Sequence, residues 1–191
     1  RTGYAFAVWW TAATGGTQIS ASTVVAGDMT CFARWKAIYT VTFDANGGSV
    51  DESSRRVVAG STVGTLPTPT RTGHSFAGWW TSATGGAQIS ASTKITGAVT
   101  YYAHWAVNQC QVTFNANGGS VIEASRMVAE GGPVGTLPTP TRSGYIFDGW
   151  FTAESGGMQI SASAVISCAV TYYAHWTWTD QPILTIDPAG R

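Results

Sequence analysis

The chain has 191 residues, of which 44% are hydrophobic and only 10% are charged, and its formal net charge is zero. A chain this apolar, with nine Trp, is too hydrophobic for disorder, and its charge balance gives no field that would attract nucleic acid or an anionic membrane surface. No apolar run approaches the roughly 18 residues of a membrane-spanning helix. We therefore expect a folded protein with no nucleic-acid partner and no membrane span in this window.

The chain opens with the second half of a pattern that returns twice in full. Its motif G-x-x-F-x-x-W starts at Gly3, Gly73 and Gly144, and its closing segment T-[YC]-[YF]-A-[HR]-W ends at Trp35, Trp105 and Trp176. Such a regular period is typical of tandem repeats. We predict a partial repeat over residues 1–35, full repeats over 36–105 and 106–176, and either the first strand of a further repeat or a tail over 177–191.

The partial repeat lacks the segment that opens a full one, so we expect it not to close its own core. Residues 184–190 read as a degenerate version of residues 41–47. We interpret the window as cut out of phase from a longer array. Alternatively, neighbouring chains complete one another's broken repeats head to tail.

Alternating hydrophobicity with β-branched and aromatic residues predicts the strands of a full repeat. In the first full repeat we expect them over residues 39–43, 55–58, 74–81, 87–89 and 99–105. A short helical turn is expected over 61–66, before Pro67 and Pro69 force an extended path. The fold class predicted is mainly β, or α+β at most.

The first expected strand runs into Asn46 and Gly47, and the same turn pair returns as Asn117 and Gly118. Both residue types tolerate positive φ, so we predict a tight hairpin turn at each place. Asp44 beside Asn46 could also belong to an oxygen-rich calcium loop, but its counterpart in the next repeat is an Asn and no second carboxylate lies nearby. The turn is the interpretation we favour.

Each repeat carries two adjacent aromatic residues in one strand, and these must point to opposite faces. We expect one of each pair in the core, together with a Phe from two other places in each full repeat. The predicted core aromatics are Trp9, Trp79, Trp150, Phe43, Phe76, Phe114 and Phe147. The outward partners Trp10, Trp80 and Phe151 would form a periodic exposed row, used for contact between neighbouring repeats or chains, for carbohydrate stacking, or for nothing.

Four motifs together resemble the Listeria-Bacteroides repeat, also called the internalin B-repeat, over nearly the whole chain: V-T-F-[DN]-A-N-G-G, LPTPTR-x-G, F-x-G-W and Y-Y-A-H-W. The resemblance implies a small β-grasp-like module of about seventy residues. In this family such modules are strung in tandem in bacterial surface proteins, between a ligand-binding head and a cell-wall or membrane anchor. The resemblance implies no enzymatic activity and no cofactor.

Two cysteines of the second full repeat lie at comparable places, because Cys110 and Cys168 each precede a Val of the first or last strand by two residues. In a β-grasp-like sheet these strands are parallel neighbours. Their starts would then be close enough to bridge, so we predict a Cys110–Cys168 disulfide. The alternative is two buried thiols, and Cys31 would stay unpaired in either case.

Two histidines in the last strands, His104 and His175, are the candidates for a catalytic base or a metal ligand. Arg34 holds their place in the partial repeat, which argues against both roles. The sequence contains no phosphate-binding loop, no G-x-S-x-G and no H-E-x-x-H. We expect neither enzymatic activity nor a bound metal.

The function that these features favour is a non-catalytic structural and adhesive repeat of an extracellular bacterial surface protein, acting as a stalk or spacer with self-association. Its expected partners are neighbouring repeats or identical chains, and host or cell-wall glycan or protein. A second hypothesis is a filament in which the tail of one chain adds a strand to the first repeat of the next, through Ile183, Leu184 and Ile186. A third is a glycan-binding module that uses the outward aromatics.

Overall fold

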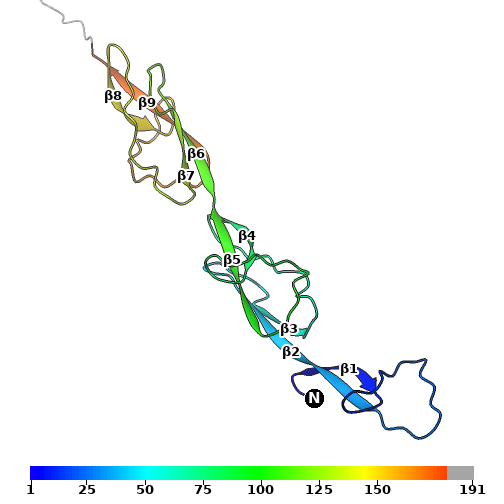
Figure 1. The fold of residues 1–191 in the computed structure, drawn as a ribbon. Coiled ribbons are helices and arrows are strands. Elements are labelled where there is room, and N and C mark those ends of the chain that lie inside the picture. Colours follow the sequence, from blue (N-terminus) through cyan, green and yellow to red (C-terminus); the bar gives the residue numbers. More distant parts are fainter. Residues whose placement is uncertain (180–191) are drawn as a thin grey trace, which may run out of the picture. The chain divides into compact units, whose positions relative to one another are not determined.

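The computed structural model describes residues 1–179, and its strands form two sheets (Figure 1). The chain divides into two compact units, Arg1–Ala106 and Val107–Arg191. The described residues contain no helix. The predicted class, mainly β with tandem small modules, is confirmed.

One long strand serves two repeats in the first unit. This unit holds β1 (Tyr4–Trp10), β2 (Phe32–Asp44), β3 (Ser54–Val58), β4 (His74–Trp80) and β5 (Val99–Val107). Residues 32–37 of β2 pair with β1, whereas residues 38–42 pair with β3 and residues 41–44 pair in parallel with β5. The predicted boundary between the partial and the first full repeat therefore falls inside a continuous strand, which Figure 1 shows in light blue.

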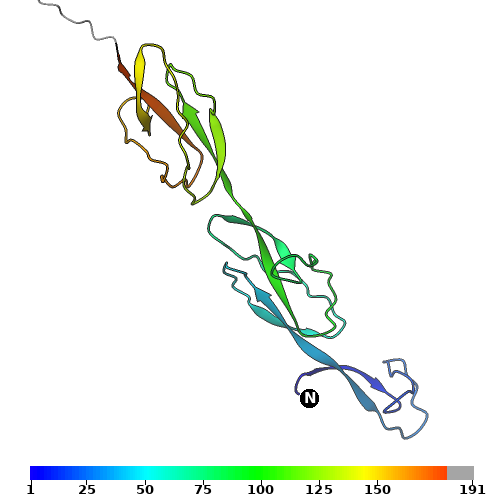
Figure 2. The same cartoon turned by 60° about the vertical axis from the view of Figure 1, so that its left-hand side comes forward.

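The second unit is a four-stranded sheet with the order β7-β6-β9-β8 (Figure 2). Its strands are β6 (Gln109–Asn115), β7 (Ser125–Ala129), β8 (Tyr145–Phe151) and β9 (Val170–Trp178). The first strand pairs in parallel with the last, with Val112 opposite Val170, as Val41 lies opposite Val99 in the first unit. Both full repeats thus build the same arrangement from matching residues.

Each full repeat closes its own hydrophobic core. Phe43 packs 5.0 Å from Trp79 between ring centroids, and Phe114 packs at the same distance from Trp150. The indole N–H groups of both tryptophans donate to carbonyl oxygens of the LPTPT segments, those of Pro67 and Pro138. The proline-rich segments are therefore fastened over the cores. The buried residues are Val41, Phe43, Val57, Val63, Trp79, Ile89, Ile95, Tyr101 and Ala103 in one repeat, and Cys110, Val112, Phe114, Val128, Val134, Trp150, Ile166, Tyr172 and Ala174 in the other.

The Asn-Gly turn has the predicted backbone, and its Asn side chain also makes hydrogen bonds that the sequence did not indicate. Asn46 and Gly47 both have positive φ, 48° and 87°, and the backbone N–H of Gly48 donates to Ala45 O, so the predicted tight turn is present. It leads into the antiparallel pair of β2 and β3, although the whole connection runs over residues 45–53. The Asn46 side chain donates to the carbonyl oxygens of Ala83 and Ala103. The turn thus ties three separate segments together, and Asn117 does the same in the second unit through Nδ2.

The helical turn expected over residues 61–66 is wrong. The backbone N–H of Val63 donates to Thr93 O, and that of Ile95 donates to Ser61 O, so the segment pairs with a distant loop instead of with itself. Val63 is buried by this pairing, and a one-turn helix offers no comparable burial. The β-grasp likeness stays a prediction. The strand expected over 87–89 is reduced to one bridge between Gln88 and Trp80.

Candidate functional site

The outward aromatic residues of β1, β4 and β8 are half-buried, because each is covered by a planar side chain of the adjoining last strand. Trp80 stacks on His104 with ring centroids 4.7 Å apart and an interplanar angle of 7°. Phe151 stacks on His175 at 3.9 Å and 9°. The expectation of a freely exposed row is therefore wrong.

The partial repeat makes the same contact with a different residue. The Arg34 guanidinium lies 3.7 Å from the centroid of the Trp10 ring. It donates to the carbonyl oxygen of Gly15, as the His104 ring bonds Ser82 O through Nε2. The exchange of His for Arg thus preserves a flat, hydrogen-bonding group on an aromatic face. The sequence carried this signal, since an aromatic residue and a planar covering residue recur at matching places in all three repeats, although their types differ.

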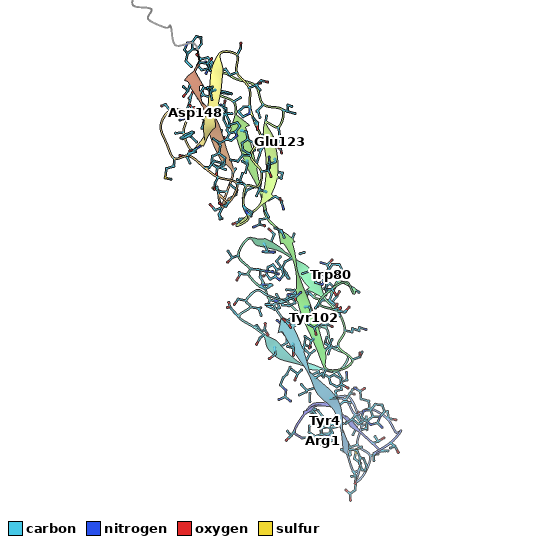
Figure 3. The ribbon with its side chains drawn as sticks, turned by 90° about the vertical axis from the view of Figure 1, so that its left-hand side faces the viewer. Arg1, Tyr4, Trp80, Tyr102, Glu123 and Asp148 are labelled. Carbon is cyan, nitrogen blue, oxygen red and sulfur yellow. The ribbon has the colours of Figure 1, made fainter. Side chains whose placement is uncertain are left out.

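Beside these stacks, the two full repeats have open pockets of similar size. One of about 340 Å3 is lined by Arg71 and His104, among others, and one of about 330 Å3 by Arg142 and His175. The second also has the carboxylates of Asp148 and Glu154. The corresponding residues 77 and 83 of the first are Ala. Figure 3 labels Trp80 and Asp148, which mark the two repeats. The two pockets have similar volumes, but only the second is lined by carboxylate residues. We therefore assign no common ligand to them.

The residues described include no group of three or more His, Cys, Asp or Glu that could hold a metal ion. No helix long and apolar enough to cross a bilayer occurs in the described part of the chain. Asp44 accepts a hydrogen bond from the backbone N–H of Asn46 at 2.8 Å, so its side chain closes the turn.

The partial repeat has an exposed apolar face. Trp9, expected in the core, is 47% exposed, whereas its counterpart Trp79 is 1% exposed. Val25 is 63% exposed, against 1% for Ile95. In the full repeat the strand with Phe43 covers these positions, and no described segment takes that place on the partial repeat. The core assignment of Trp9 is wrong for this reason.

The same absence alters the backbone. Residues 99–102 are strand in the full repeat, where they pair in parallel with residues 41–44. Their counterparts are residues 29–32, of which 29–31 are not strand, because β2 begins only at Phe32. We call the exposed apolar side chains on the Trp9 side of this sheet the repeat-1 face, and they are Phe6, Trp9, Val25, Met29 and Trp35.

The other predicted site residues lie as follows. Phe43, Trp79, Phe114 and Trp150 are buried, and Phe76 and Phe147 are partly buried against the same cores. The tail residues Ile183, Leu184 and Ile186 lie outside the described residues.

The three cysteines are free thiols, with Cys110 buried and Cys31 and Cys168 exposed. Burial, with smaller contributions from the nearby charges of Glu130 and Cys168, raises the pKa of the Cys110 thiol. The disulfide stays a prediction.

Known proteins share this pattern of residues. The chain is 34% identical over 158 residues to a protein of Evansella cellulosilytica named as a membrane protein, with 78% of this chain and 23% of the relative covered. It is 30% identical over 151 residues to Internalin H of Listeria monocytogenes, with 75% of this chain and 26% of the relative covered. The chain thus spans about a quarter of the length of these relatives. No solved structure matches it. The sequence profile of the Listeria-Bacteroides repeat domain matches residues 1–34, 39–104 and 111–175, and the chain belongs to this family.

Proposed function

We propose that this chain is a non-catalytic structural and adhesive section of an extracellular bacterial surface protein, serving as a stalk or spacer with self-association. The observation that carries the proposal is the duplication of one complete β-module. Each copy has its own closed core, with the same residue types at most of the matching places. Repetition of a self-contained unit extends a chain without adding a new kind of site.

The strand pairing supports a load-bearing role. In each full repeat the first and last strands are parallel neighbours, so the chain enters and leaves at opposite ends of one hydrogen-bonded pair. Tension along the chain then shears all the hydrogen bonds of the pair together instead of opening them one by one. Between the partial and first full repeat, the continuous strand β2 adds stiffness.

Family membership supports the location. Internalin H and two Evansella proteins named as membrane proteins contain similar repeats. Brief trypsin treatment of intact producing cells tests the surface location, because a surface-exposed chain is cleaved while a cytoplasmic control protein is spared. Survival of the chain in intact cells, with cleavage after lysis, would contradict it.

Head-to-tail strand complementation is a second candidate function, which the repeat-1 face favours. In the full repeats, Phe43 and Phe114 cover the positions that stay open in this face. Residues 183–186 resemble the strand that carries them. One donated strand would replace only part of the missing half, since the return strand and the LPTPT segment would still be absent.

The filament is tested by sedimentation of the full chain at high concentration. If complementation operates, the chain forms concentration-dependent polymers, and Ile186→Asp abolishes them because a carboxylate cannot enter the apolar face. Thr185→Ser is the matched control. A strictly monomeric chain contradicts the filament.

A glycan-binding role for Trp10, Trp80 and Phe151 stays a prediction. Their rings are half-buried against Arg34, His104 and His175, which reduces the area open for stacking on a sugar. A glycan array without binding, or binding unchanged by Trp80→Ala, would remove this hypothesis.

A further inference from the structure

The two full repeats differ at a pair of positions that change together. Cys110 and Cys168 stand where the first full repeat has Tyr39 and Gly97. Tyr39 is half-buried against its core, and Gly97 lines a hollow of about 240 Å3 beside the start of β5. At these two positions the first full repeat therefore has one large side chain and one glycine, whereas the second has two thiols.

The place of Gly97 accepts a side chain without strain. A Cβ added there would meet no atom within 4 Å, and Gly97 does not have the positive φ that would demand glycine. A cysteine at the equivalent position 168 is thus compatible with the fold of the repeat.

The strand register brings the two cysteines toward each other. Val112 lies opposite Val170 in the parallel pair of β6 and β9, and each cysteine is two residues before one of these partners. Residues two apart in a strand share a face, and neighbouring strands lie about 4.8 Å apart. Where the bend before Val170 continues beside β6, that spacing falls within the roughly 4.4–6.8 Å between Cα atoms that a disulfide spans. Cys110 is buried on the core side, and Cys168 is exposed in the bend before β9.

We propose that Cys110 and Cys168 form a disulfide lock that joins the starts of the terminal strand pair of the second full repeat, so that tension cannot extend the segment between the two cysteines. The proposal rests on the load-bearing role above and deepens it. A covalent bond at the start of the parallel pair joins the two strands that tension would otherwise pull past each other. The first full repeat, which has Tyr39 and Gly97 at these places, stays extensible.

The oxidation proceeds by thiol–disulfide exchange with a small disulfide or a disulfide oxidoreductase. The exposed Cys168 thiolate attacks one sulfur of the donor, and the first donor thiol leaves. The Cys110 thiolate then attacks Sγ of Cys168 and expels the second donor thiol. Two protons leave the cysteines, and two electrons pass to the donor disulfide.

The bond is tested on the full chain with oxidised glutathione under native conditions. Non-reducing peptide mapping is expected to find Cys110 joined to Cys168, with the loss of two hydrogen atoms, and Cys31 open to alkylation. Both thiols of the pair remaining alkylatable after exhaustive oxidation would overturn the proposal, as would pairing of Cys31 with either.

The lock is tested by stretching single full-length chains held at both ends. Reduced chains are expected to give two similar unfolding steps, one for each full repeat. In oxidised chains one step should shorten by about 200 Å, the extended length of the segment between the cysteines. Dithiothreitol should restore it.

Cys168→Ser should abolish the shortening under oxidising conditions, and Cys31→Ser is the matched control that should keep it. Two full-length steps in chains with a mapped disulfide would overturn the lock. These measurements use the purified chain and are therefore independent of the trypsin test. A cytoplasmic location would contradict the proposed function but would leave the result on the disulfide unchanged.

Discussion

Two glycines of the loop after the first strand are constrained by space. A Cβ on Gly48 would lie 2.5 Å from the carbonyl oxygen of Thr70 and 2.6 Å from the Trp105 ring. The ring cannot withdraw freely, because its N–H donates to Ala45 O at 2.9 Å. Gly119 has the same surroundings in the second unit. This loop therefore packs against the last strand only without a side chain.

We predict that Gly48→Ala lowers the free energy of unfolding of the first full repeat by about 1–3 kcal/mol, the typical range for overpacking. Urea unfolding followed by Trp fluorescence should then show an additional transition at lower denaturant. Gly97→Ala is the control, and its midpoint should be unchanged or slightly higher, since an added Cβ there meets nothing. Equal midpoints for Gly48→Ala and the parent chain would contradict the close packing.

A second prediction concerns position 104, where the full repeat has His and the partial repeat has Arg34 at the matching place. His104→Arg should keep the free energy of unfolding within about 0.5 kcal/mol, because Arg34 already shows that a guanidinium fits this place. His104→Ala should lower it by about 1 kcal/mol through loss of the stack on Trp80 and of the bond to Ser82 O. The measurement is again the urea midpoint. Equal losses in both variants would show that stacking on Trp80 contributes nothing.

Among the elements, β1 and β4 carry the same aromatic pair but face different surroundings. Trp79 of β4 is covered by Phe43, whereas Trp9 of β1 contacts Phe6 and has no strand over it. We predict that Trp79→Ala destabilises its repeat by about 3–5 kcal/mol. Trp9→Ala should change the free energy of unfolding by less than about 1 kcal/mol.

Thermal unfolding monitored by near-ultraviolet circular dichroism compares these two variants directly. A large loss for Trp9→Ala in dilute solution would mean that another segment covers the repeat-1 face. It would then favour strand complementation over an open face.

The strands of the full repeats could be predicted from their alternating residues, because burial on one face leaves a period of two in the sequence. The loop pairing of Val63 with Thr93 could not, since it joins backbone groups of segments with no periodicity. The side-chain ties of Asn46 were also missed, because turn chemistry explains an Asn-Gly pair without any distant partner. The disulfide prediction depended on knowing that the first and last strands are parallel, which came from the resemblance.

At the scale of the whole molecule, residues 1–179 contain two repeats with closed cores and one whose core side is open. Local stability follows the number of buried apolar contacts, so opening should cost less in the partial repeat. We predict faster hydrogen exchange at the backbone amides of β1 than at those of β4 or β8. Mass spectrometry of peptic fragments from dilute chain measures this. Equal protection of β1 and β4 would contradict it. The difference in exchange rate between β4 and β8 serves as the control, because both strands belong to complete repeats.

The sharing of β2 has a consequence for the order of events during synthesis. Residues 4–10 are synthesised before β5, whereas β2, with which they pair, completes its own pairing only when β5 has been made and has paired with residues 41–44. Nascent domains ordinarily acquire structure from the amino terminus onward. We therefore expect β1 to reach its final pairing only after β5, a strand that is synthesised after it.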